Sequence, residues 1–251
     1  IAEVLADLRA RGLERTVRVL PAAGGRIRLD GREVLNFSSN DYLALAGSRP
    51  AIAAAARALE AYGAGSTASR LVAGTLPIHE ELERRLAAWK GKPASLVFGS
   101  GWMANAGAVA AIVGRGDHVF ADRLAHASII DAAVVSRADL HRFQHNDPES
   151  LEALLRDAPA AGRRLVVTES IFSMDGDLAP LADIARIAMR RDAMLMVDEA
   201  HATGIFGPSG SGNHRGTAAI PPSKVLPGRL APRDLADPTF FPHHSHVLFI
   251  P

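Results

Sequence analysis

Between residues 94 and 197, short apolar runs alternate with longer segments whose apolar residues recur at helical spacing. The pattern predicts strands at Ala94–Phe98, Asp117–Ala121, Asp139–Phe143, Leu165–Thr168 and Met194–Val197. It predicts helices between them at Met103–Val113, Ala127–Val135, Pro148–Arg156 and Pro180–Arg191. Strands and helices that alternate in this way belong to α/β folds. We therefore expect a mostly parallel sheet that is covered by helices on both faces.

Polar side chains gather where these predicted strands end. A Gly-Ser-Gly turn follows the first strand, and acidic residues, histidines or a serine follow the second, fourth and fifth. The residues concerned are Asp122, His126, Glu169, Ser173, Asp198 and His201. Because ligands bind to open parallel sheets at the carboxyl ends of the strands, the sequence predicts an active site at this edge.

The fifth predicted strand delivers Asp198 and His201 in the stretch LMVDEAHATG. Asp198 could hold a protonated ring nitrogen, bind a metal ion or act as a base, and His126 with Asp198 and His201 could serve a metal hydrolase. The letters DEAH also occur in nucleotide-driven helicases, but these need a G-x-x-x-x-G-K-[ST] phosphate loop. The chain contains no such loop, so the helicase interpretation is set aside.

Composition excludes several other classes of function. The 251 residues include no cysteine, which removes disulfides, thiolate metal sites and cysteine nucleophiles. A formal net charge of +1 gives no reason to expect nucleic acid or an anionic membrane as a partner. The first twenty residues alternate charged and apolar residues, unlike a signal peptide, and no apolar run is long enough to span a membrane. A cytoplasmic protein is the expectation.

The first ninety residues carry shorter elements. We expect an amphipathic helix over 1–15, a hairpin with strands at Arg26–Leu29 and Glu33–Phe37, and helices at Pro50–Ala61 and from Pro77 to Lys90. A loop rich in glycine and hydroxyl residues, 62–75, separates the two helices. Residues 213–251 hold seven of the fifteen prolines and show no clear period, so they are expected to form an irregular tail.

Single residues leave their roles open at this stage. The turn in FGSGWMAN (98–105) could bind a phosphate at a helix N-terminus or could be an ordinary strand-to-helix turn. His126 could lie flat on an aromatic ring, and Ser173 could donate to a bound group or cap a turn. Arg15 and Arg70 could each meet a substrate carboxylate, although an arginine taken singly is more often a solvated charge.

Taken together, the motifs resemble those of the α-oxoamine synthases, a family of fold type I pyridoxal-phosphate enzymes. Seven segments occur in the order typical of that family, over roughly residues 1–212. They are LNFSSNDYLAL (35–45), GAGSTASRLVAGT (63–75), FGSGWMANAG (98–107), ADRLAHASIIDA (121–132), FQHND (143–147), VVTESIFSMDGDLAPL (166–181) and MVDEAHATGIFG (196–207).

The resemblance implies a pyridoxal 5′-phosphate site, no metal ion, and a role for each candidate residue. Asp198 would pair with the ring nitrogen, His201 would hydrogen-bond the phenolic oxygen, and His126 would stack on the ring. Further contacts to the cofactor are implied for Gly101, Trp102, Glu169 and Ser173. Substrate contacts are implied for Arg15, Asn40 and His126.

The implied reaction is a decarboxylative condensation of L-alanine with a pimeloyl thioester in biotin synthesis, catalysed by homodimers with active sites at the interface. A glycine-using member, 2-amino-3-ketobutyrate ligase or 5-aminolevulinate synthase, remains an alternative. SSNDYLAL and FQHND favour the alanine-using type. The implied domains are an N-terminal segment (1–45), a cofactor-binding large domain (46–212) and a tail unlike the family (213–251).

One expected motif is missing from the 251 residues. The family carries Ser/Thr-x-Gly/Ser-Lys after the Asp–His segment, and its lysine forms the covalent bond to the cofactor. Lys224 follows a serine, but prolines flank it and its spacing is short. We also expect these residues to lack the family's C-terminal domain. We therefore expect an incomplete large domain and a chain with little or no catalytic activity, or a non-catalytic fragment that at most binds cofactor or pairs with a partner.

Overall fold

The computed structural model describes residues 1–17, 19–20, 25–212 and 247–250 of the chain. The chain divides into two compact units, Ile1–Thr67 and Ala68–Pro251. This division falls after the second helix, whereas the sequence-based division placed that helix in the large domain. No helix in the described part is long and apolar enough to cross a membrane.

The described residues of the first unit form two helices and a hairpin. Their bounds are α1 Ala2–Ala10, β1 Arg26–Leu29, β2 Arg32–Leu35 and α2 Arg49–Tyr62. The strands join through Asp30 and Gly31, both at positive φ, as a two-residue hairpin turn requires. Ser48 caps α2 by accepting a hydrogen bond from the Ala51 amide. Helix α1 is shorter than predicted because the chain turns at Gly12, whose φ is 65°.

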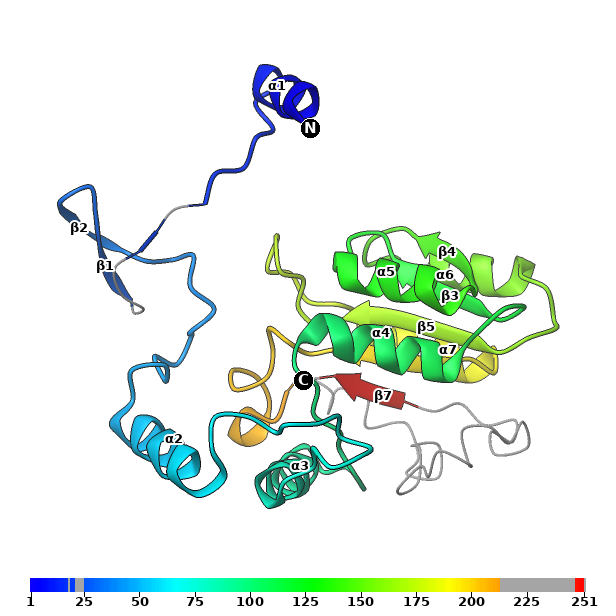
Figure 1. Cartoon of the computed structure of the whole chain (residues 1–251). Helices are drawn as coiled ribbons and strands as arrows, with labels where there is room; N and C mark the ends of the chain where they lie inside the picture. Colours follow the sequence, from blue (N-terminus) through cyan, green and yellow to red (C-terminus); the bar gives the residue numbers. More distant parts are fainter. Residues whose placement is uncertain (18, 21–24, 213–246, 251) are drawn as a thin grey trace. The chain divides into compact units, whose positions relative to one another are not determined.

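In the second unit, the described residues form a five-stranded parallel sheet with the order β4-β3-β5-β6-β7. The strands are β3 His118–Asp122, β4 Asp139–Phe143, β5 Arg164–Glu169, β6 Met194–Asp198 and β7 Val247–Ile250. The helices of this unit are α3 Pro77–Lys90, α4 Gly101–Ile112, α5 Ala127–Ser136, α6 Pro148–Asp157 and α7 Leu181–Arg190. The predicted parallel sheet is confirmed (Figure 1).

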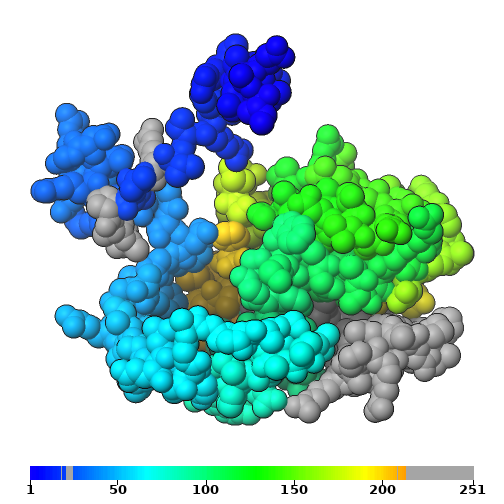
Figure 2. All heavy atoms as spheres, viewed as in Figure 1, coloured from blue at the N-terminus to red at the C-terminus, as the bar shows by residue number. Residues whose placement is uncertain are grey.

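Side chains alternate between two cores, one on each face of the sheet. On one face, α4 and α5 pack against Val119, Ala121, Leu165, Val167, Met194 and Met196. On the other face, α6 and α7 pack against Phe120, Val166, Leu195 and Val197. Both faces of the central strands are therefore apolar, which explains why their sequences are continuous hydrophobic runs. Figure 2 shows this part of the chain, in green to yellow, as one closely packed body.

The order of the strands creates a switch point. The chain passes from β3 through α5 to β4, then crosses back through α6 to β5 on the far side of β3. The crossovers on the two sides of β3 therefore use opposite faces of the sheet. In such folds a crevice opens at the carboxyl ends of the strands where the order reverses. Here those ends belong to β3 and β5, with β6 next to β5.

The strand predicted at Ala94–Phe98 does not form, and this prediction was wrong. The segment is irregular, and its polar groups bond to helix α3 rather than to a neighbouring strand. The Val97 amide donates to the Glu83 carboxylate over 2.9 Å, and the Ser95 hydroxyl donates to the Glu83 carbonyl over 2.7 Å. An apolar run alone cannot show whether a strand lies beside it to complete a ladder.

The described residues of the tail that was predicted to be irregular form a strand. Residues 247–250 form β7, which pairs in parallel with β6, and Leu195 lies opposite Val247. The expectation of irregular structure is therefore wrong for these four residues. The rest of that segment, with Lys224, lies outside the described residues.

A buried ion pair connects the end of α3 to the segment after β6. The Lys90 ammonium lies 3.1 Å from the Glu199 carboxylate and donates to the Thr203 hydroxyl over 2.7 Å. Glu199 is fully buried and Lys90 almost so. Gly212 lies so close that a Cβ there would come within 2.3 Å of the Glu199 carboxylate. Charges this deep are tolerated only when they are paired.

We expect Glu199→Ala to lower the free energy of unfolding by about 3–5 kcal/mol, because the Lys90 charge then stays buried without its partner. The double change Lys90→Met with Glu199→Leu should restore most of the loss. Urea denaturation followed by circular dichroism measures both. Glu81→Ala, which removes exposed ion pairs on α3, is the control and should change stability little. A single Glu199→Ala variant as stable as that control would contradict the argument.

Candidate active site

Three neighbouring strands end in carboxylates that the structure buries. β3 ends in Asp122, β5 in Glu169 and β6 in Asp198. In the register of the sheet, Glu169 lies directly opposite Asp198. Alternation along the strands places these two side chains on the face covered by α4 and α5, and Asp122 on the face covered by α6 and α7. The predicted gathering of polar residues at this edge is therefore present.

Asp198 is buried, with an exposed fraction of 8 %. One carboxylate oxygen accepts the Asn105 side-chain amide over 3.1 Å, and the other accepts the Ala200 backbone amide over 3.0 Å. Within the described part of the chain, no cationic side chain pairs with Asp198. A buried carboxylate with two neutral donors and no cation suits a ligand that presents an N⁺–H group.

A chain of hydrogen bonds runs from Asp198 to His126. Asn105, on α4, also donates to the Ser128 hydroxyl over 2.8 Å. The Ser128 hydroxyl lies 2.7 Å from Nδ1 of His126, which caps α5 by accepting the Ser128 amide. These bonds fix His126 at the helix start while its ring stays exposed. Oδ1 of Asn105 is buried without a hydrogen-bond partner among the described residues, so it could accept a hydrogen bond from a bound ligand.

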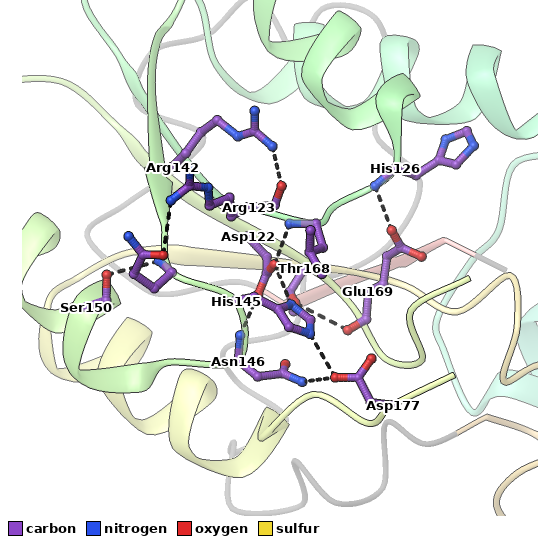
Figure 3. Close-up of polar contacts among 12 residues, drawn as sticks. Asp122, Arg123, His126, Arg142, His145, Asn146, Ser150, Thr168, Glu169 and Asp177 are labelled. Carbon is purple, nitrogen blue, oxygen red and sulfur yellow. Dashed lines mark hydrogen bonds and ion pairs between the residues drawn. The ribbon is translucent and has the colours of Figure 1, made fainter. Parts of the chain in front are cut away.

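Glu169 accepts the backbone amide of His126 over 2.6 Å. Figure 3 shows the Glu169 carboxylate facing this amide while the imidazole of His126 points away. Burial raises the pKa of Glu169 from its ordinary 4.5 to about 7, and the negative charge of Asp198 adds to the effect, although hydrogen bonds from the backbone of His126 and Ser173 oppose it. The carboxyl at the end of β5 can therefore exchange a proton near neutral pH.

Helix α4 starts at Gly101, beside the same edge of the sheet. Its N-cap, Ser100, accepts the Met103 amide over 3.2 Å, although no strand precedes the turn as the sequence had predicted. The first-turn amides of Gly101 and Trp102 have no carbonyl within the helix to bond, which makes such an N-terminus suitable for a phosphate. Trp102 donates its indole N–H to Asp131 of α5 over 3.0 Å. Asn105 follows one turn later on the same side of α4.

The other residues predicted from the sequence lie in turns and loops, in the first unit, or in an ion pair elsewhere. His201 is half-buried in the turn that follows Asp198, and Ser173 is exposed on the loop between β5 and α7. Arg15 and Asn40 belong to the first unit, so their part in the site remains a prediction. Arg70 forms an ion pair with Glu83 at 3.0 Å, which occupies the guanidinium that could have met a substrate carboxylate. In the described residues, no group of three or more histidine or acidic side chains could hold a metal ion.

Sequence reasoning missed several residues that build this region. Asn105 and Ser128 connect Asp198 to His126, and His145 joins Asp122 to Asp177. Asn105 could have been found from its spacing, because it lies on the same helix face as Gly101. Nothing in the local sequence reveals that Ser128 meets Asn105 of α4, or that His145 meets Asp122 at the end of β3.

The chain belongs to the aminotransferase class I and II family, whose profile matches residues 32–222. Curated relatives carry a more specific name, 8-amino-7-oxononanoate synthase. The chain is 56% identical to that of Citrifermentans bemidjiense over 213 residues, which cover 84% of this chain and 54% of the relative. It is 54% identical to that of Anaeromyxobacter sp. strain K, with 84% and 53% covered. The chain thus spans about half the length of the curated relatives it matches.

Solved structures agree with the fold. A serine palmitoyltransferase from S. paucimobilis, solved with PLP and myriocin bound, is 33% identical and has a TM-score of 0.79, with 86% of this chain and 55% of that chain covered. The 8-amino-7-oxononanoate synthase of Francisella tularensis is 30% identical with a TM-score of 0.61, and the match covers 72% of this chain and 50% of that chain. The expected fold type I large domain is confirmed.

Glu169 should make folding stability depend on pH. Its folded pKa of about 7 lies above the ordinary 4.5. The stability that its protonated form contributes is therefore complete below about pH 4.5 and lost as the pH rises through about 7, an upper limit of about 3 kcal/mol. The fall should be smaller in Glu169→Gln, which mimics the protonated form, and the remaining fall comes from groups such as His145, whose pKa is also raised. It should persist in full in the exposed control Glu60→Gln. Urea denaturation from pH 5 to 8 measures it; parallel profiles for wild type and Glu169→Gln would disprove it.

Proposed function

We propose that this chain derives from a pyridoxal-phosphate enzyme that condenses L-alanine with a pimeloyl thioester. The products are 8-amino-7-oxononanoate, carbon dioxide and the free thiol, and the reaction belongs to biotin synthesis. The names of relatives up to 56% identical support this choice over the glycine-using members of the family. The single observation that carries the cofactor is buried Asp198, which has no cationic side chain among its partners in the described residues.

The residues at the sheet edge fit pyridoxal phosphate. Asp198 would keep a proton on the ring nitrogen, because a buried carboxylate stabilises the cation beside it. Asn105 would hold the Asp198 carboxylate in place through its 3.1 Å hydrogen bond. The amides of Gly101 and Trp102 would receive the phosphate at the start of α4. When bound, the cofactor supplies an electron sink for the charge that develops on the amino-acid carbon.

The other residues would orient the ring and the substrates. His126 would lie against the ring face, because its position at the α5 N-cap is fixed while its ring is exposed. His201 would hydrogen-bond the phenolic oxygen of the cofactor. Glu169 and Ser173 would make further polar contacts that hold the cofactor ring. Arg15 and Asn40 would contact the acyl substrate. We further propose a cytoplasmic homodimer, in which a second copy completes the substrate cleft.

The three lysines of the sequence are poorly suited to a covalent bond with the cofactor. Lys90 is held in the buried ion pair with Glu199 at 3.1 Å. Lys92 has Trp89 where the motif requires a serine or threonine, and it precedes the Asp–His segment that the motif should follow. Lys224 lies outside the described residues and lacks the motif around it. We therefore propose that a polypeptide of these 251 residues binds the cofactor without a covalent bond and does not turn over.

We expect Asp198→Asn to weaken the binding of pyridoxal phosphate at least about tenfold, because the ring cation loses a buried counter-charge that is worth roughly 1.4 kcal/mol or more. Titration of intrinsic fluorescence measures the dissociation constant. Asp192→Asn is the matched control, since it removes the same charge from the turn before the same strand. Equal affinity in Asp198→Asn and wild type would refute the assignment of Asp198.

A second test concerns the lysines. After incubation with pyridoxal phosphate and reduction with borohydride, peptide mapping by mass spectrometry should find no lysine modified above the level of a denatured control. Incubation with L-alanine and pimeloyl-CoA should release no free thiol. A reduced adduct on Lys224 together with thiol release would overturn the proposed inactivity. Release with glycine or L-serine in place of alanine would instead point to another member of the family.

A further inference from the structure

On the face of the sheet away from Asn105, the ring of His145 lies between two carboxylates (Figure 3). Nδ1 lies 2.9 Å from Asp122, which is fully buried at the end of β3. Nε2 lies 2.8 Å from Asp177, on the loop between β5 and α7. The edge of the ring packs on Phe172, with 4.4 Å between the centroids. These three residues, Asp122, His145 and Asp177, are called the clasp below.

The clasp uses both nitrogens of the imidazole. A neutral ring has one N–H and would turn a lone pair toward one of the two carboxylates, whereas the doubly protonated ring donates to both. Burial lowers the pKa of His145, but the hydrogen bonds to Asp122 and Asp177 outweigh burial, so the pKa is raised above its ordinary value. The charged groups that face the ring are therefore Asp122 from β3 and Asp177 from the loop.

The clasp holds one side of the loop formed by residues 170–178. Asn146, next to His145, adds a hydrogen bond from its side-chain amide to Asp177 over 2.6 Å. Asn146 also donates its backbone amide to Asp122 over 3.0 Å, so this one residue contacts both carboxylates of the clasp. The tip of the loop is exposed, and Met174 there is 91% exposed. Apolar packing therefore does little to hold the tip.

The other side of the same loop reaches the proposed cofactor site. The Ser170 amide donates to the Asp198 carbonyl over 2.8 Å, and the backbone of Ser173 hydrogen-bonds the Glu169 carboxylate. Glu169 in turn holds the amide of His126. A shift of the loop would thus move a partner of Glu169, on the opposite face of the sheet from the clasp.

We propose that His145, with Asp122 and Asp177, is a positioning residue that fixes the 170–178 loop so that Ser173 and Glu169 keep their place at the cofactor site. The part that concerns the cofactor rests on the proposed function. The part that concerns the order of the loop stands independently of it.

The variant that tests the clasp is Asp177→Ala, because Asp177 is partly exposed and its loss leaves the buried Asp122–His145 pair intact. Asp175→Ala, two residues away on the exposed tip, is the matched control. Hydrogen exchange followed by mass spectrometry should show peptides of 170–178 exchanging about tenfold faster in Asp177→Ala, with β5 and β6 unchanged. Asp177→Asn keeps an acceptor oxygen and should restore most of the protection.

The same variants are titrated with pyridoxal phosphate. Asp177→Ala should weaken binding about fivefold or more, and Asp175→Ala by less than about twofold. The proposal is overturned if Asp177→Ala leaves loop exchange unchanged or accelerates exchange throughout the sheet. It is also overturned if the wild type binds pyridoxal phosphate and Asp177→Ala, with a loosened loop, binds it equally tightly. A wild type that does not bind pyridoxal phosphate refutes the proposed cofactor instead, and loop exchange then decides the inference.

Discussion

The structure depends on how three carboxylates are stabilised at one edge of a parallel sheet. Asp122, Glu169 and Asp198 end neighbouring strands, and each is buried. Removing such groups from water is costly unless donors or opposite charges surround them. Each carboxylate is stabilised in a different way. Asp122 meets an imidazole and backbone amides, Asp198 meets neutral amides, and the pKa of Glu169 rises to about 7.

These differences divide the edge into two parts with separate tasks. On the face covered by α4 and α5, Asn105 and Ser128 connect Asp198 to His126. On the other face, His145 joins Asp122 to the 170–178 loop. Strand alternation separates the parts, because residues that are neighbours in sequence point to opposite faces. The 170–178 loop contacts residues of both parts. A change in the conformation of the loop would therefore affect the proposed site.

Local patterns predicted much of this arrangement. Apolar periodicity located the strands that end at Asp122, Glu169 and Asp198, and most of the helices between them. The strand predicted at Ala94–Phe98 was wrong because apolar character does not reveal a ladder partner, and Glu83 of α3 took its hydrogen bonds instead. The FQHND motif was noticed only as a family resemblance. The structure shows His145 in the clasp and Asp147 capping α6.

The sequence by itself determined the fold class and the residue types at the strand ends, because periodicity and strand termination are local properties of the chain. The order of the seven motifs, which is a property of the sequence alone, also indicated the family. Only the tertiary structure decided which polar groups meet across the sheet: Asn105 with Asp198, and His145 with Asp122 and Asp177. The physical reason is that pairing between distant segments follows from strand order and register, which no local pattern contains.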